Sequence, residues 1–135
     1  MTIVAGYIPT PEGVAAVDHA IDLAVQSGAK LVVVNTGHYG DNANPSFATA
    51  EDLDALRDQL AQIKLEHEVR QVTQGRSAAE EVLDVASEVD ATLIVIGIRR
   101  RTAVGKLITG STAQQILLDA DCPVLAVKAR PAPTG

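Results

Sequence analysis

The stretch TLIVIGIRRRTAVGKLITGSTAQQ, residues Thr92–Gln115, runs from a strand through a connection into the start of a helix. Its first six residues, Thr92–Gly97, are almost entirely apolar, which favours a central strand covered on both faces. Ser111 followed by Gln114 has the spacing of a capping box, which predicts a helix start. A buried strand that leads into a helix is the unit from which parallel α/β sheets are built.

The same alternation extends outward through the chain. Strands are predicted at 2–7, 30–35, 68–72, 92–97 and 123–128. Helices are predicted at 12–26, after Thr49, after Ser77 and from Ser111. This order predicts the α/β class, as one doubly wound domain with a five-stranded parallel sheet. The expected strand order is 3-2-1-4-5, with helices on both faces.

Apolar residues at steps of three and four predict which helix faces are buried. In the first helix this stripe is Val14, Val17, Ile21 and Ala24. In the second helix it is Leu53, Leu56, Leu60 and Ile63.

Length and composition predict a single domain and argue against nucleic-acid and membrane partners. The 135 residues are 47% hydrophobic but only 2% aromatic, so aliphatic side chains must fill the core of a single domain. We expect the domain at 1–130 and a disordered tail at 131–135. A formal net charge of −6 argues against a nucleic-acid partner. The lack of a long apolar run or a secretory leader predicts a cytoplasmic protein with no membrane partner.

The connection after Gly97 concentrates positive charge. Four of the 11 basic residues stand within eight positions: Arg99, Arg100, Arg101 and Lys106. Gly110–Thr112 opens a helix, where unpaired N–H groups and the positive end of the dipole favour anions. Gly97 lacks a side chain, which allows the close approach of a ligand or of another backbone. Two interpretations stay open: a phosphate-binding segment, or a solvated loop before a capped helix.

Several motifs are excluded. A P-loop would need Ser or Thr after Gly105-Lys106 and Gly at position 100, but Leu107 and Arg100 stand there. The Rossmann fingerprint and the nucleophile elbow are missing as well. The three histidines are scattered and Cys122 stands alone, so no metal site and no catalytic residue are predicted.

The segment LIVIGIRRRTAVGKLITGSTAQQILLDADCPVLAVK, Leu93–Lys128, resembles the C-terminal signature of the universal stress protein family. That signature is G-x-x-G-x9-G-[ST], followed by a helix and a Cys-Pro-Val strand. The resemblance implies the adenine nucleotide alpha-hydrolase-like fold, usually as a dimer. Some members of the family bind ATP or AMP, so the resemblance also implies one of these nucleotides as the cofactor, with Mg accompanying ATP. Other members bind no nucleotide.

Carried over by position, Gly97 and Gly110-Ser111 match the family's first and last motif residues. Arg100 replaces the second glycine, so that its side chain either blocks the site or supplies a guanidinium to the phosphates. Tyr7 stands where the family often has Asp, and would either stack on adenine or fill the site. The candidate nucleotide-binding residues are Tyr7, Thr36, Gly97, Arg99, Arg100, Gly110, Ser111 and Thr112.

The expected function is a stress-response regulatory module whose nucleotide occupancy alters the 99–109 connection. The alternative is a stress-associated interaction protein with a degenerate nucleotide site. An enzyme with slow ATP hydrolysis ranks last. The resemblance also implies a homodimer formed through the last strand, Pro123–Lys128, which is apolar and expected at a sheet edge.

Cys122 could be a redox sensor or a structural thiol. Asp119 and Asp121 flank it, and negative neighbours disfavour a thiolate. The structural thiol is therefore the favoured interpretation.

Overall fold

In a computed structural model of the chain, residues 1–8, 10–36, 50–72, 77–98 and 111–129 are described. Strands and helices alternate strictly along these residues. In chain order they are β1 (Thr2–Tyr7), α1 (Pro11–Ser27), β2 (Lys30–Thr36), α2 (Ala50–Gln62), β3 (His67–Val72), α3 (Ala78–Glu88), β4 (Leu93–Ile98), α4 (Ser111–Asp119) and β5 (Val124–Lys128).

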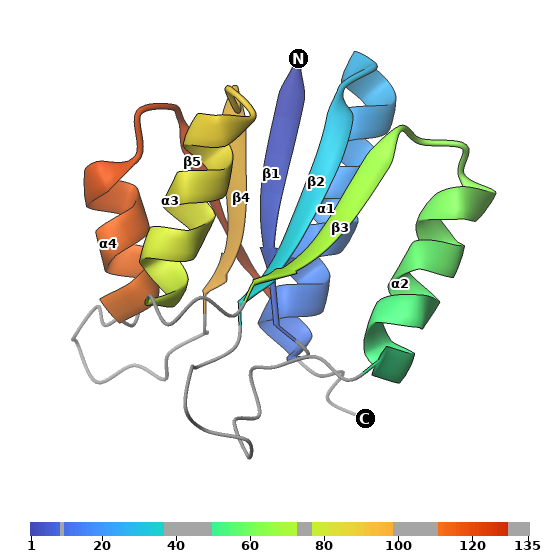
Figure 1. Ribbon diagram of the computed structural model, residues 1–135, viewed down its shortest axis with the longest axis horizontal. Helices are drawn as coiled ribbons and strands as arrows, with labels where there is room; N and C mark the ends of the chain where they lie inside the picture. The colour runs from blue at the N-terminus through green and yellow to red at the C-terminus, as the bar shows by residue number, and fades with distance from the viewer. Residues whose placement is uncertain (9, 37–49, 73–76, 99–110, 130–135) are drawn as a thin grey trace.

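The five strands form one sheet in the order β3-β2-β1-β4-β5, and every neighbouring pair is parallel. Helices α1 and α2 cover one face, whereas α3 and α4 cover the other (Figure 1). This arrangement confirms the predicted doubly wound sheet. Because the strands are parallel, their carboxyl ends all meet at one edge of the sheet.

The sheet divides the core into two layers. One layer packs the side chains of β1 and β2 against α1 and α2, and the other packs alternate residues of the same strands against α3 and α4. Side chains on a strand point alternately to the two faces, so a strand in contact with both layers must be apolar throughout. The run Leu31–Val34 in β2 meets this requirement and is fully buried.

Local sequence signals set the helix ends. The Thr10 hydroxyl accepts a hydrogen bond from Gly13 N–H at 3.1 Å, and Pro11 opens α1. Gly28 ends α1 with a φ of 71°, a left-handed conformation that favours glycine. Ser77 and Glu80 form the predicted capping box at the start of α3.

Two predicted core positions are wrong. Val14 is 47% exposed, and Ile63 is 38% exposed and lies beyond the end of α2. The buried face of α1 includes Val17, Ile21 and Ala24 of the predicted stripe, and its other members are small residues that allow close contact with the sheet. Its members are Gly13, Ala16, Val17, Ala20, Ile21 and Ala24.

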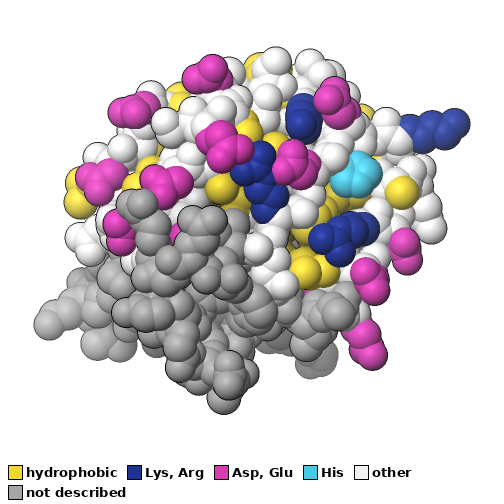
Figure 2. Space-filling model, in the orientation of Figure 1, with side chains coloured by type: hydrophobic (Ala, Val, Ile, Leu, Met, Phe, Trp, Pro, Cys, Tyr) yellow, Lys and Arg dark blue, Asp and Glu magenta, His cyan; other side chains and the backbone are white. Residues whose placement is uncertain are grey.

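Charged side chains lie over the part of the sheet that α3 and α4 do not cover. Figure 2 shows acidic and basic side chains interspersed on this face, with hydrophobic side chains between them. Arg70 of β3 pairs with Glu68 on its own strand, and its Nη1 lies 2.7 Å from Glu88 Oε2 at the end of α3. Lys30 Nζ lies 3.8 Å from Glu68 Oε1. These pairs join β3 to β2 and to α3.

Within the described ranges, no helix is both long and apolar enough to cross a membrane. The same described ranges hold no cluster of three or more His, Cys, Asp or Glu side chains that could bind a metal ion. Thr49 and the predicted tail at 131–135 lie outside the described residues.

Candidate functional site

Strands β1 and β4 stop pairing before they reach the carboxyl edge of the sheet. They pair only from Ile3 with Leu93 to Ala5 with Val95. Beyond that point β1 stays paired with β2 as far as Tyr7, and β4 stays paired with β5 as far as Ile98. The strand order reverses between β1 and β4, and such a switch point is where open α/β sheets bind ligands.

The first turn of α1 packs directly against the end of β4. A Cβ added to Gly97 would collide with the backbone carbonyl of Glu12, and one added to Gly13 would collide with the carbonyl of Ile8. Both glycines are therefore needed for backbone to approach backbone. The sequence left open whether Gly97 makes room for a ligand or for another backbone segment. Among the described residues, the backbone of Glu12 occupies that space.

Tyr7 ends β1 with its ring inside the protein. The residue is only 9% exposed and belongs to the core layer formed by α1 and α2. Burial raises the pKa of the Tyr7 hydroxyl, and the negative charge of Asp52 in the first turn of α2 raises it further. Tyr7 thus fills space beneath the carboxyl edge, and its contact with a nucleotide stays a prediction.

Asn35 is a residue of this edge that the sequence reasoning missed. It is fully buried in β2, its Nδ2 donates to the Tyr7 carbonyl at 2.8 Å, and Gln71 Nε2 donates to its Oδ1 at 3.0 Å. The three residues stand in register on β1, β2 and β3. One signal could have found Asn35: it is the single amide that follows the apolar run Leu31–Val34 in a central strand.

The other predicted binding residues fall into two groups. Thr36 is the last residue of β2, Ser111 is the first residue of α4, and Thr112 is exposed on the first turn of α4. The start of α4 lies toward the carboxyl edge, so these residues share that edge with Tyr7 and Gly97 (Figure 1). Three predicted residues lie outside the described residues: Arg99, Arg100 and Gly110.

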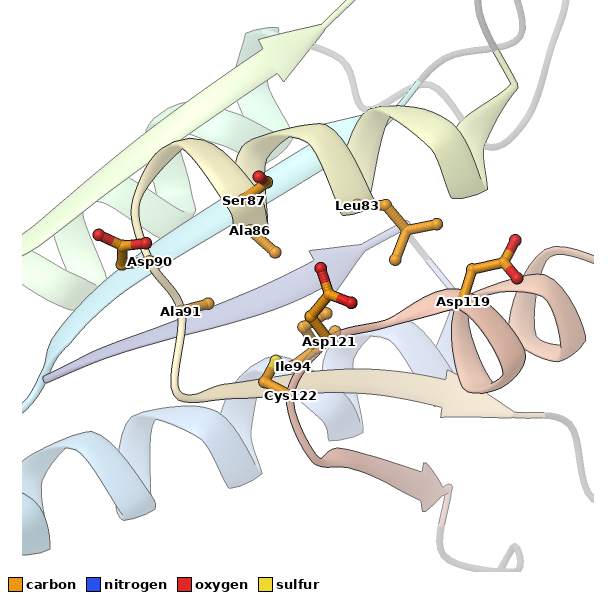
Figure 3. A pocket seen from close by; sticks show the side chains of 9 residues that line it. All are labelled: Leu83, Ala86, Ser87, Asp90, Ala91, Ile94, Asp119, Asp121 and Cys122. Carbon is orange, nitrogen blue, oxygen red and sulfur yellow. The ribbon is translucent and has the colours of Figure 1, made fainter.

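A cavity of about 320 Å³ lies at the opposite, amino edge of the sheet. Figure 3 shows Asp121 projecting into the space between α3 and the turn before β5, with Cys122 close to Ile94. Asp90 and Asp119 also line this cavity, so its carboxylates would repel a phosphate. Burial raises the pKa of the Cys122 thiol and Asp121 raises it further, which agrees with the structural thiol favoured from sequence.

Comparison with known proteins establishes the family. A sequence model of the universal stress protein family matches residues 1–128. A universal stress protein of Mycolicibacterium smegmatis is 40% identical over 126 residues, which cover 93% of this chain and 96% of that protein. The structure of a universal stress protein from Archaeoglobus fulgidus has a TM-score of 0.69 and 29% identity, and the match covers 93% of this chain and 97% of that one.

A second solved structure carries a ligand. It is the universal stress protein from Archaeoglobus fulgidus in complex with dAMP, with a TM-score of 0.64 and 24% identity. The match covers 93% of this chain and 96% of that chain, and at this identity it supports the fold alone. Taken with the family match over residues 1–128, these likenesses show that the chain belongs to the universal stress protein family.

Proposed function

We propose that this chain binds an adenine nucleotide, ATP or AMP, at the carboxyl edge of its sheet, and acts as a small cytoplasmic regulatory module in stress responses. The observation that carries the proposal is that β1 and β4 stop pairing after Ala5 and Val95, at the edge of the sheet toward which α4 also begins (Figure 1). The dAMP complex of the Archaeoglobus fulgidus relative supports adenine nucleotide as the ligand class.

The phosphates would lie at the start of α4. The first N–H groups of a helix lack partners within it, and its dipole favours negative charge there. Ser111 and Thr112 would add hydroxyl donors, and Arg99 or Arg100 would add charge-assisted hydrogen bonds. Mg would accompany ATP and would offset part of the negative charge of its phosphates. The nucleoside would lie toward the ends of β1 and β2, near Tyr7 and Thr36.

One observation favours the alternative, an interaction protein with a degenerate nucleotide site. The ring of Tyr7 belongs to the core, and the backbone of Glu12 occupies the space beside Gly97. Tyr7 therefore offers little free surface to a ligand, and the side of Gly97 that a Cβ would occupy is already filled. In this alternative the carboxyl edge contacts a protein partner without nucleotide.

Titration calorimetry with ATP, with and without Mg, and with AMP distinguishes the two functions. We expect a saturable heat of binding, a higher melting temperature in the presence of nucleotide, and no comparable response to GTP. Ser111→Ala should weaken binding, whereas Ser87→Ala, at the other end of the molecule in α3, should not. A lack of heat at millimolar ATP and AMP would leave the interaction protein as the function.

Arg100→Gly decides the role of the arginine that replaces the second motif glycine. The substitution should strengthen ATP binding if the side chain obstructs the site. It should weaken binding if the guanidinium contacts phosphate, because a charge-assisted hydrogen bond is then lost. Arg57→Gly is a suitable control for the loss of one positive charge, because Arg57 lies in α2 and pairs with Asp54.

We also propose that two copies of the chain pair through β5. The strand forms one edge of the sheet, and four of its five residues are half-buried aliphatic side chains. Such an edge presents unpaired backbone groups to a second strand. The opposite edge strand, β3, carries His67, Glu68 and Arg70 and is less suited to pairing.

A further inference from the structure

We propose that Asn35 is a positioning residue for the carboxyl-edge site. Its buried amide joins the ends of β1, β2 and β3, and thereby sets the position of Tyr7 and of the turn that leads into α1. The inference rests on the proposed nucleotide binding, since it assigns Asn35 the task of shaping that site. It nevertheless makes a separate claim about the local stability of the chain after Tyr7.

The hydrogen bonds of Asn35 fix which way its amide points. The Tyr7 carbonyl can only accept, so the group 2.8 Å from it must be the Asn35 NH₂. The Asn35 oxygen then faces Gln71 Nε2 at 3.0 Å. The amide therefore uses its donor toward β1 and its acceptor toward β3, which links three parallel strands at one level of the sheet.

A buried amide at this position destabilises the fold unless its hydrogen bonds are made. Burying an amide without a hydrogen bond costs roughly 1–3 kcal/mol, and the preceding residues Leu31–Val34 are aliphatic. Leucine has the same number of side-chain heavy atoms and carries no polar group that needs a partner. The task on the β1 side is clear from the pairing, because Gly6 and Tyr7 lie beyond the last residues that pair with β4. Asn35 secures the Tyr7 carbonyl where support from β4 has ended.

A short series of contacts leads from Asn35 to Gly97. Tyr7 is followed by Ile8, whose carbonyl accepts from Thr10 N–H at 2.8 Å and lies against Gly13. Thr10 caps α1, and the first turn of α1 packs its Glu12 backbone against Gly97. A displacement of Tyr7 would therefore move the start of α1 relative to β4, at the point where the proposed ligand site opens.

The test compares Asn35→Leu with Val33→Ala. Val33 lies two residues earlier on the same strand and the same face, is fully buried, and has an aliphatic side chain that takes no part in hydrogen bonding. Both variants disturb the same core layer, but only Asn35→Leu removes the bond to the Tyr7 carbonyl. Asn35→Val, which repeats the residue type at 32–34, serves as a second variant if the leucine is not accommodated.

Two readouts separate positioning from general stability. The first is the dissociation constant for ATP and AMP, together with the melting temperature. The second is hydrogen exchange of the backbone amides of Tyr7, Ile8 and Thr10, measured by NMR. We expect Asn35→Leu to weaken nucleotide binding by about tenfold or more and to speed exchange selectively at these amides. Val33→Ala should lower the melting temperature with little change in affinity and no selective change in exchange.

The outcomes decide between the two proposals. Equal losses of affinity in Asn35→Leu and Val33→Ala at equal loss of melting temperature would overturn the positioning role, as would unchanged affinity in Asn35→Leu. If the unaltered chain binds no nucleotide, the proposed function fails, and exchange alone decides the claim on Asn35. Selectively faster exchange at Tyr7, Ile8 and Thr10 would then support the claim, and its absence would overturn it.

Discussion

At the scale of single residues, Gly97 shows how a motif glycine can serve the fold. Its missing side chain leaves room for the Glu12 carbonyl in the first turn of α1. A backbone segment cannot move aside as a flexible side chain can, so an added methyl group there must displace α1 or β4. The motif glycine is therefore needed whether or not a ligand is bound.

Gly97→Ala should lower the free energy of unfolding by roughly 1–3 kcal/mol, the usual cost of forcing extra atoms into a well-packed interior. Urea denaturation measures this loss. Gly6→Ala is the matched control, because a Cβ there would lie 3.6 Å from Ile96 Cγ2 and 3.8 Å from Val82 Cγ2, which are ordinary contacts. It should keep or raise stability, since glycine weakens a strand interior. Equal losses in both variants would contradict the role assigned to Gly97.

Tyr7 should make stability depend on alkaline pH. Its pKa is raised by burial and by Asp52 above its value near 10 in the unfolded chain. A raised pKa means that the folded state favours the neutral hydroxyl, so this contribution is complete below pH 10 and is lost as the pH rises through the folded pKa. We expect the urea midpoint of the unaltered chain to fall more steeply above pH 10 than that of Tyr7→Phe. Parallel curves would place the Tyr7 hydroxyl in solvent.

At the scale of elements, the sequence predicted every strand and helix to within a few residues because their signals are local. Capping residues, Gly28 and continuous apolar runs each act over a few positions. The predicted stripe on α1 is wrong at Val14, because the spacing of large aliphatic residues does not show which small residues contact the sheet. The helix instead approaches the sheet through Gly13, Ala16 and Ala20, whose small size permits close packing.

The candidate site could be predicted only in part. Motif positions pointed to Gly97 and Ser111; both belong to elements that meet the carboxyl edge, where the switch-point rule expects a ligand, and their binding of one stays a prediction. The sequence could single out Asn35 as a buried amide but not the role proposed for it, because its partners Tyr7 and Gln71 are 28 and 36 residues away in sequence. Hydrogen bonds between strands depend on register, and one residue of slippage would turn the amide to the other face.

Arg70 and Glu68 should form an ion pair on β3 that is lost in acid. The hydrogen bond from Arg70 lowers the pKa of Glu68 below the ordinary value of 4.5. A lowered pKa stabilises the fold above about pH 4.5, and this contribution is lost as the pH falls through the folded pKa of Glu68. Because Glu68 is partly exposed, Arg70→Met should cost about 1 kcal/mol or less at neutral pH, and this cost should shrink below pH 4.5.

Arg57→Met is the control for that prediction. Arg57 and Asp54 form an exposed pair within α2, with Nη1 3.7 Å from Oδ1, and such pairs contribute little. Urea midpoints measured from pH 3 to 7 should therefore separate the two variants only above the pKa of Glu68. If Arg70→Met loses the same free energy at every pH, packing of the arginine stem, and not its ion pair with Glu68, stabilises the fold.

At the scale of the whole molecule, the backbone N–H groups that point outward from the two edge strands decide where a second copy of the chain can pair with the sheet. Ile94 N–H donates to the Pro123 carbonyl at 3.0 Å, which starts the ladder between β4 and β5. Inward and outward backbone groups alternate along a parallel edge strand, so the N–H groups of Val124 and Ala126 point away from β4. At the other edge, the ladder between β2 and β3 starts where Leu31 N–H donates to the Glu66 carbonyl at 3.0 Å. The N–H group of His67 therefore points outward from β3.

Ala126→Pro should therefore convert the proposed dimer into a folded monomer. Proline removes an outward N–H that a second β5 would need, yet leaves the bonds to β4 in place. A two-fold axis would set the two β5 strands antiparallel, so one substitution acts on both sides of the contact. Light scattering at micromolar concentration should give twice the 14.1 kDa chain mass for the unaltered protein and for His67→Pro, and one chain mass for Ala126→Pro. A monomeric unaltered chain, or an Ala126→Pro variant that stays dimeric, would rule out pairing through β5.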